Sequence, residues 1–248
     1  MRYFLTLAYN GTSFHGWQRQ PNATSVQQAL EEALTTLLRK PIAITGAGRT
    51  DTGVHAKEMM AHFEGDLSLE EEENLPYLLN RFLKEEIVIY RLDKVKADAH
   101  ARFDATVRTY EYHLGFQKNP FKQQLYYYFH QPVSVEKMNE AAKILLEYED
   151  FEAFAKTHSD VKTFLCNVTR ADWESTAEGA IFTITANRFL RNMVRAIVGT
   201  LLEIGTGKIE VVDMHKIIQS KNRGEAGFSV PAAGLYLTEI QYPKSIYL

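Results

Sequence analysis

The residues Gly46-Ala47-Gly48-Arg49-Thr50-Asp51-Thr52-Gly53-Val54-His55-Ala56 link two short runs, 42–45 and 61–64, that are predicted to be strands. Three glycines within eight positions pack no side chain and cost backbone entropy. They therefore favour a tight turn or the close approach of another backbone or a ligand. The only acid in the stretch is Asp51. Two interpretations are open on these residues alone: Asp51 caps a helix or an Asx-turn beside a solvated Arg49, or its carboxylate carries out chemistry.

The glycines do not match a nucleotide-binding loop. A P-loop closes with lysine followed by serine or threonine, and the stretch has no such pair. The spacing of a dinucleotide fingerprint is also missing, because position 51 is Asp. The sequence therefore favours the carboxylate as the chemical reagent.

On the N-terminal side of this stretch, the sequence predicts a strand and then a helix. Apolar and polar residues alternate over residues 3–9, which predicts a strand that ends at an Asn-Gly turn. Ser25 and Gln28 have capping-box spacing, and an apolar face follows them. The resulting helix is predicted to end at residues 39–41, Arg-Lys-Pro.

On the C-terminal side, residues 69–83 predict a helix and residues 87–95 a strand. The acidic run 70–73 stands at the start of that helix, where the helix dipole favours negative charge. The first hundred residues are thus predicted to have a β-α-β-β-α-β order.

The second half has a similar order of elements with longer insertions and no visible sequence repeat. We predict strands at 109–114, 125–129, 171–175, 180–186 and 235–242, and helices at 135–146 and 189–204. Mixed elements with hairpins favour an α+β fold with a largely antiparallel sheet.

Composition is that of an ordinary globular protein. The 248 residues are 45% hydrophobic and 24% charged, enough to bury a substantial core. No apolar run approaches the roughly 20 residues of a membrane span, and the N-terminus lacks the pattern of a signal peptide. We therefore expect a cytoplasmic protein that does not enter a membrane. The single Cys166 excludes an intramolecular disulfide and a multi-cysteine metal site.

The histidines do not predict a metal centre. His55 and His62 are seven positions apart and do not form a zinc-binding H-E-x-x-H pair. Neither His15 nor His158 has a readable partner. A Ser-His-Asp triad stays open, since its members converge from distant positions, but no residue favours one.

The formal charge of −3 does not favour a nucleic-acid binder, because phosphate contacts need clustered lysine and arginine. A nucleic-acid interface therefore requires an uneven charge distribution. The arginines expected near the candidate site are Arg49, Arg102, Arg108, Arg188, Arg191 and Arg195.

Five stretches together resemble a known family. Residues 48–56 resemble the catalytic motif of the TruA-type family of tRNA pseudouridine synthases, in which the aspartate is the nucleophile. Four more resemble the same family in the same order: Tyr-Asn-Gly-Thr-Ser-Phe-His-Gly-Trp-Gln at 9–18, Arg-Thr-Tyr-Glu-Tyr at 108–112, Asn-Met-Val-Arg-Ala-Ile-Val-Gly at 192–199, and Gly-Leu-Tyr-Leu at 234–237. They extend over nearly the whole chain.

The resemblance implies a particular architecture. It predicts two ferredoxin-like halves that form a joined, largely antiparallel sheet, with the active cleft between them. The expected halves are residues 1–104, which carry the Asp51 stretch, and residues 105–248, which carry Tyr110, Arg195 and Leu235.

On the predicted helix 189–204, Arg188, Arg191 and Arg195 recur at i, i+3 and i+7 opposite the apolar arc. The pattern alone also fits an ordinary solvated face. The resemblance implies that Arg195 reaches the nucleophilic Asp51, and that Arg188 and Arg191 are candidates for phosphate contacts.

Strand alternation places Arg108, Tyr110 and Tyr112 on one face of their strand. A tyrosine there usually packs in the core, and we keep that interpretation for Tyr112. The resemblance implies that Tyr110 stacks on the target base, with its hydroxyl placed for proton chemistry. It also implies that Leu235 forms an apolar wall of the pocket, and Arg49 is expected to help displace the uridine from its stack.

The implied activity is isomerisation of uridine to pseudouridine in the anticodon stem of tRNA, at positions 38 to 40, by a homodimer that needs no cofactor. Three alternatives stay open. They are a pseudouridine synthase with another RNA target, a non-catalytic RNA-binding module, and an Asp-dependent glycoside hydrolase, although the last lacks a well-placed second carboxylate.

Overall fold

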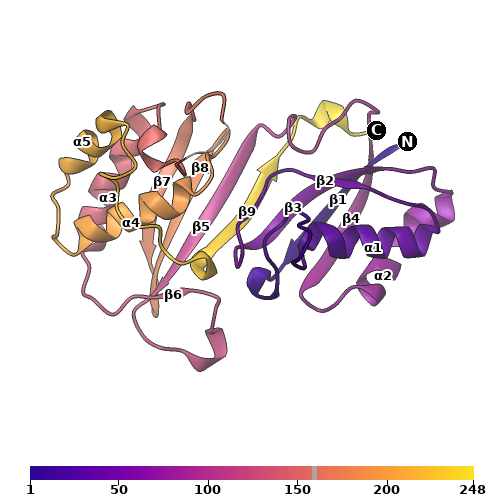
Figure 1. Ribbon diagram of the computed structural model, residues 1–248, viewed down its shortest axis with the longest axis horizontal. Helices are drawn as coiled ribbons and strands as arrows, with labels where there is room; N and C mark the ends of the chain where they lie inside the picture. The colour runs from indigo at the N-terminus through magenta and orange to yellow at the C-terminus, as the bar shows by residue number, and fades with distance from the viewer. Residues whose placement is uncertain (158–160) are drawn as a thin grey trace. The chain divides into compact units, whose positions relative to one another are not determined.

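The computed structural model shows an α+β protein (Figure 1). It describes residues 1–157 and 161–248, and His158 lies outside these ranges. The chain divides into two units. Unit 1 consists of Met1–Val107 and Leu237–Leu248, and unit 2 of Arg108–Tyr236. The division into halves 1–104 and 105–248 stays a prediction.

Unit 1 contains the β-α-β-β-α-β order that the sequence predicts. Its elements are β1 (Arg2–Tyr9), α1 (Val26–Leu38), β2 (Ile44–Gly46), β3 (His55–Glu64), α2 (Leu69–Phe82) and β4 (Ile87–Val95). The sheet runs β4-β1-β3, β2 also pairs with β3, and these pairings are antiparallel. Strand β9 (Leu235–Gln241), most of which belongs to unit 1, follows β3 in the sheet. Two helices that connect a largely antiparallel sheet in this order make a ferredoxin-like unit.

The ends of the two helices follow from their sequences. The Ser25 hydroxyl accepts a hydrogen bond from the backbone N–H of Gln28, and α1 ends where Arg39 adopts a left-handed conformation at φ 54°. Ser68 and Glu71 form a complete capping box at the start of α2. The first turn of α2 holds the acidic residues, as expected.

Strand β3 is longer than the prediction of 61–64, because it begins at His55. Its extra residues pair with β1, and Ala56 lies opposite Tyr9 and Met59 opposite Leu7. The alternation in this part is obscured because both faces of the strand are largely buried. The loop that holds Asp51 therefore spans only residues 47–54.

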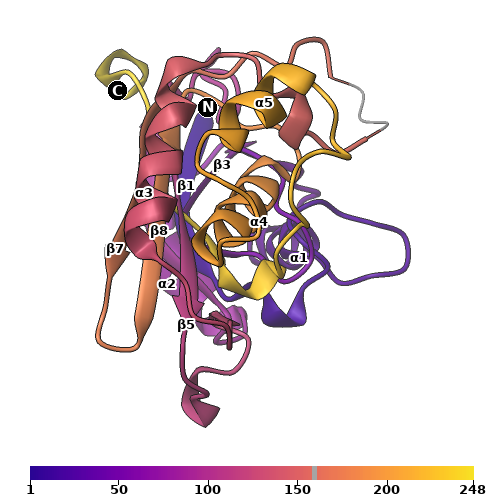
Figure 2. The same ribbon diagram turned by 90° about the vertical axis from the view of Figure 1, so that its left-hand side faces the viewer.

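Unit 2 contributes further antiparallel strands to the sheet, with helices packed on them. Its elements are β5 (Val107–Gly115), β6 (Tyr127–Tyr128), α3 (Val135–Ile144), β7 (Val168–Ser175), β8 (Gly179–Ala186), α4 (Met193–Gly205) and α5 (Asp213–Ser220). The strands run β5-β8-β7, and the short β6 pairs in parallel with β5. Figure 2, which turns unit 2 toward the viewer, shows α3 alongside β7. There the Asn139 side chain bonds both the N–H and the carbonyl of Trp173.

Helix α4 begins at Met193, so the prediction of a helix from 189 is wrong. Asn192 has φ 69°, a left-handed conformation that separates the preceding segment from the helix. Arg188 and Arg191 therefore lie before α4 and form no helical stripe with Arg195. The apolar Phe189 fitted the helical periodicity by its residue type alone. Its ring packs on Tyr110 and not along the face of the helix.

Other elements also differ from the prediction. The strand predicted at 125–129 is only β6, and the helix predicted at 135–146 ends at Ile144 before a short 3-10 turn. Helix α5 was not predicted, although Met214, Ile217 and Ile218 bury one face of it. In the part of the chain that the structure describes, no helix combines the length and apolarity needed to cross a membrane.

Candidate active site

The Asp51 loop leaves β2 and turns back into β3 within unit 1. The Asp51 carbonyl accepts a hydrogen bond from the N–H of Val54 at 3.1 Å, which closes a tight turn. The Thr50 hydroxyl lies 2.9 Å from the hydroxyl of the buried Tyr9. The Asp51 side chain is half-buried, whereas Arg49 is exposed. The backbone therefore turns at Asp51, and both the capping and the chemical interpretation of its carboxylate stay predictions.

The segment that follows β1 contacts the backbone of this loop at Thr50 and Asp51. The Trp17 N–H donates to the Thr50 carbonyl at 3.3 Å. Gly16 has φ 85°, and a Cβ there would overlap the Thr50 carbonyl oxygen and lie 3.1 Å from the carbonyl carbon of Asp51. Only glycine fits this conformation and this approach. Two of the motif stretches, far apart in the sequence, therefore pack against each other.

His55 has a structural contact next to the loop. It is 1% exposed, and its Nδ1 accepts a hydrogen bond from the Gly11 N–H at 3.0 Å. Nδ1 is therefore the unprotonated ring nitrogen. Among residues 1–157 and 161–248, no group of three or more His, Cys, Asp or Glu side chains could hold a metal ion.

In unit 2, Arg195 is held by the segment that precedes β9. Its Nε donates to the Val230 carbonyl at 2.7 Å, and its own carbonyl accepts from the Val230 N–H at 3.2 Å. One turn later along α4, a Cβ on Gly199 would overlap the Phe228 carbonyl oxygen. The backbone of this segment therefore lies directly on the helix, and the Nε bond to Val230 restrains the Arg195 guanidinium.

A residue that the sequence analysis missed supports the same segment. The Arg223 guanidinium donates to the carbonyls of Ala226 and Gly227, at 3.2 and 3.0 Å, and to the Ser229 hydroxyl at 2.9 Å. Arg223 stands in an irregular stretch with neither a motif nor periodicity. No sequence pattern could therefore have marked it.

Tyr110 and Tyr112 point to different environments on β5. The Tyr110 ring is half-buried and meets the Phe189 ring edge to face, with centroids 5.1 Å apart. Tyr112 is fully buried and donates its hydroxyl proton to the Pro231 carbonyl at 2.8 Å, and burial raises its pKa. Tyr112 is confirmed as a packing residue. Phe189 is a second aromatic beside Tyr110 that the sequence analysis had assigned to the helix.

The remaining candidates occupy varied positions. Leu235 is 7% exposed at the start of β9. Arg188 donates to the Thr163 carbonyl at 3.3 Å. Arg191 is exposed, and its carbonyl accepts from the Lys156 N–H at 3.0 Å. The structure thus places Asp51 and Arg49 in unit 1 and the other candidate residues in unit 2.

Comparison with known proteins gives the family. A family model described as tRNA pseudouridine synthase matches residues 6–104 and 141–243. The chain belongs to the tRNA pseudouridine synthase family. The resemblance inferred from the motifs is thus confirmed. The matched ranges of the tRNA pseudouridine synthase model include Asp51 and Arg195, and Tyr110 lies between them.

Relatives named tRNA pseudouridine synthase A match along their whole length. The protein from Porphyromonas gingivalis is 52% identical, with 100% of this chain and 99% of the relative covered. The protein from Bacteroides fragilis is 51% identical over 99% of this chain and 98% of its own. The more distant protein from Bacillus subtilis is 38% identical over 98% and 99%.

Proposed function

We propose that this protein isomerises uridine to pseudouridine in tRNA, with Asp51 as the nucleophile. The observation that carries the proposal is the match to tRNA pseudouridine synthases along the whole chain, together with the fixed loop that presents Asp51. In the reaction, the bond between N1 of the base and C1′ of the sugar breaks and a bond from C5 to C1′ forms. The proton on C5 leaves, and N1 gains one.

Asp51 supplies the electron pair that starts the exchange. Its carboxylate forms a bond either to C1′ of the sugar or to the base, and the N1–C1′ bond breaks. The base then rotates, C5 bonds to C1′, and the bond to Asp51 breaks, which frees the carboxylate. A loop held at Thr50 by Tyr9 and Trp17 keeps the carboxylate in a narrow range of positions. Such positioning is a large part of catalysis when reacting atoms must lie within about 3–3.5 Å.

The residues of unit 2 are assigned to the base and to the charge on Asp51. Arg195 is proposed to hold the carboxylate through its planar guanidinium, which is restrained by the Nε bond to Val230. Tyr110, braced edge to face by Phe189, is proposed to stack on the target uracil and to take part in the proton transfer at C5. Leu235 is proposed as an apolar wall beside the base.

Removing a uridine from its stack costs a few kcal/mol, which contacts to the RNA must offset. Arg49, exposed beside the nucleophile, is proposed to assist this displacement. Arg188 and Arg191 are proposed to contact phosphates, although both precede α4 instead of lining it. We further propose the anticodon stem, positions 38 to 40, as the target, and a cytoplasmic homodimer as the active form.

The deciding experiment measures tritium release from tRNA labelled at C5 of uridine. Asp51→Asn should abolish release while changing tRNA affinity less than about twofold, because the amide keeps the shape and loses the nucleophile. Asp98→Asn, on an exposed residue of the same unit, is the matched control and should release tritium like the native protein.

Substantial release by Asp51→Asn would contradict the nucleophile assignment. No release by the native protein would favour the RNA-binding-module alternative. Mapping pseudouridine in the product tRNA identifies the modified positions, and light scattering against the chain mass of 28.4 kDa tests the homodimer.

A further inference from the structure

We propose that Gln27 and Glu31, two neighbouring side chains on α1, are positioning residues that set the Asp51 loop for catalysis. The two residues are called the α1 bridge below. The inference rests on the proposed function, since it concerns the same reaction. It comes from hydrogen bonds within unit 1 that join α1 to residues 17–19 and to Ile44, the two segments that support the loop.

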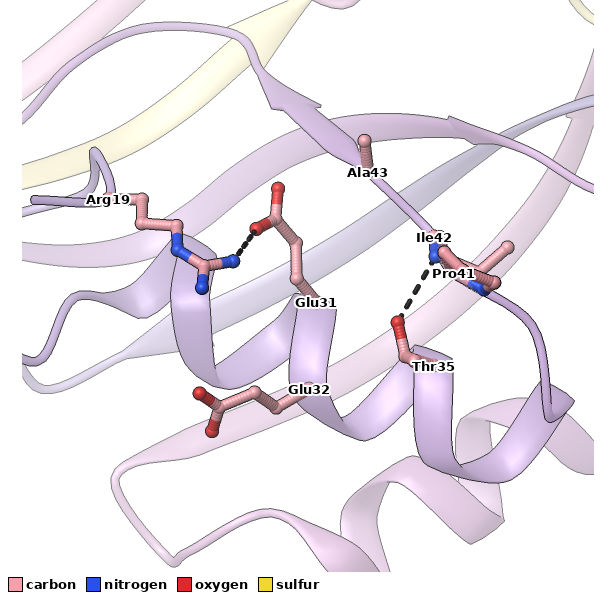
Figure 3. A pocket seen from close by; sticks show the side chains of 7 residues that line it. All are labelled: Arg19, Glu31, Glu32, Thr35, Pro41, Ile42 and Ala43. Carbon is pink, nitrogen blue, oxygen red and sulfur yellow. Dashed lines mark hydrogen bonds and ion pairs between the residues drawn. The ribbon is translucent and has the colours of Figure 1, made fainter. Parts of the chain in front are cut away.

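Glu31 is an acid whose side chain is only 11% exposed, and it accepts three hydrogen bonds. Its Oε2 accepts from the Arg19 guanidinium at 3.1 Å, a contact that Figure 3 shows from the side of the helix. Its Oε1 accepts from the Gln27 amide at 3.0 Å and from the Ile44 N–H at 3.2 Å. The carboxylate thus joins α1 to the segment after Trp17 and to the first residue of β2.

Gln27 makes the same connection with its backbone and its amide. Its N–H donates to the Trp17 carbonyl at 3.0 Å, and its Oε1 accepts from the Arg19 N–H at 3.0 Å. Its Nε2 donates to the Ile44 carbonyl at 3.0 Å as well as to Glu31. Every polar atom of this side chain is therefore used to hold residues 17–19 and Ile44 at a fixed separation.

These two segments are the direct supports of the Asp51 loop. Strand β2 begins at Ile44 and leads directly into the loop. Within the loop, the Thr50 carbonyl accepts a hydrogen bond from the Trp17 N–H. The Trp17 indole lies so close to Gly46 that a Cβ there would overlap the ring. A shift of either segment relative to the other would therefore move the backbone next to Asp51.

The chemistry of the bridge favours positioning over bulk stabilisation. A buried carboxylate loses hydration, and well-packed apolar residues often stabilise a fold as well or better. Hydrogen bonds to a charged acceptor are nevertheless strong and directional, which suits them to fix a separation. Glu31 binds Arg19 and the Ile44 N–H, which belong to the two segments that support the loop. The position of its carboxylate therefore affects the position of Asp51.

The test compares Glu31→Gln with Glu32→Gln. The next residue on α1, Glu32, is exposed, and its carboxylate accepts from the Gln28 amide at 2.8 Å. In Figure 3 a dashed line joins Arg19 to Glu31 and none joins it to Glu32, so substitution of Glu32 makes the same chemical change outside the bridge. Glu31→Gln replaces one acceptor oxygen with an amide that faces N–H donors. At saturating tRNA, we expect its single-turnover tritium release to slow at least tenfold, with tRNA affinity within about twofold.

A second measurement does not depend on activity. Hydrogen exchange of the amides of residues 47–54 should quicken in Glu31→Gln and stay native in Glu32→Gln. Gln27→Ala, which removes the other half of the bridge, should act in the same way and add little to Glu31→Gln in the double variant. If Glu31→Gln does not fold, the rate and the exchange of Gln27→Ala test the inference in its place.

A native single-turnover rate in the folded bridge variants would overturn the inference. So would a rate loss that vanishes once the rate is divided by the folded fraction from near-ultraviolet circular dichroism. Absence of tritium release from both the native protein and Glu32→Gln would instead overturn the proposed function. Unchanged exchange at residues 47–54 in the bridge variants would then overturn the bridge as well.

Discussion

Replacing Gly16 with alanine adds one methyl group behind the proposed nucleophile. Gly16 has φ 85°, a conformation that costs an L-residue about 1–2 kcal/mol. The new Cβ would also overlap the Thr50 carbonyl oxygen and lie 3.1 Å from the Asp51 carbonyl carbon. Ordinary contacts need about 3.5 Å, so the Thr50–Asp51 peptide must move by roughly 1 Å.

Both effects have a measurable size. Loss of the Trp17 N–H bond to Thr50 adds about 1 kcal/mol to the backbone strain, for a total of about 2–3 kcal/mol. For a chain of this length, that lowers the melting temperature by about 4–12 °C. A displacement of about 1 Å at the nucleophile costs on the order of 10²-fold in the rate of the chemical step.

The assay combines single-turnover tritium release with thermal unfolding, and Gly207→Ala is the control. Gly207 has a similar φ of 76°, but its added Cβ would meet no described atom within 4 Å outside Gly207 and its two chain neighbours. The control should lose about 1–2 kcal/mol of stability and keep its rate, because the strain occurs without a clash. If Gly16→Ala remained folded and turned over within threefold of the native rate, the claim that Gly16 positions Asp51 would be refuted.

Two further predictions concern Tyr110 and His62. Tyr110→Phe keeps the edge-to-face contact with Phe189 and removes the hydroxyl, so tRNA binding should persist while single-turnover release slows about 10²- to 10⁴-fold; native turnover would leave stacking as the only supported role. Burial, the His100 ring and the Arg2 guanidinium lower the pKa of the 8% exposed His62 from 6.5 to about 4. Between these values only the unfolded chain binds the proton, so the free energy of unfolding should fall by about 3 kcal/mol as the pH drops from 6.5 to 4. Urea titrations should show His62→Gln flattening this dependence, and an equal slope in both proteins would contradict it.

The regular elements of unit 1 could be predicted because their determinants are local. Strand β4 falls at Ile87–Val95, as expected, α1 follows the Ser25 cap that the spacing indicated, and α2 begins at Leu69, as predicted. The start of β3 could not be found, because its burial on both faces removes the alternation. Its extent is fixed by pairing with β1, which is a non-local interaction.

The sequence proposes residues for the candidate site, but it does not show what supports them. Asp51 stands out as the only acid in a glycine-rich stretch, and its assigned role came from the family resemblance. The stripe of Arg188, Arg191 and Arg195 was misjudged, because a single left-handed residue at Asn192 interrupts an otherwise helical pattern. Phe189 acts through a contact with Tyr110, which is distant in the sequence, and periodicity carries no information about such a contact. Arg223 acts through bonds to residues three to six positions further on, in an irregular stretch that has no periodicity.

In each unit, a proposed functional side chain lies next to a backbone contact that only glycine permits. Gly16 brings one segment against the peptide of Asp51, and Gly199 brings the segment containing Val230 against the helix of Arg195. Close backbone contacts leave less room for motion than side-chain packing does, since no rotamer can absorb a shift. A reaction that depends on a carboxylate placed within a few tenths of an ångström benefits from such supports. We therefore propose that the glycines of these motifs serve the chemistry indirectly, by fixing the backbone from which Asp51 and Arg195 extend.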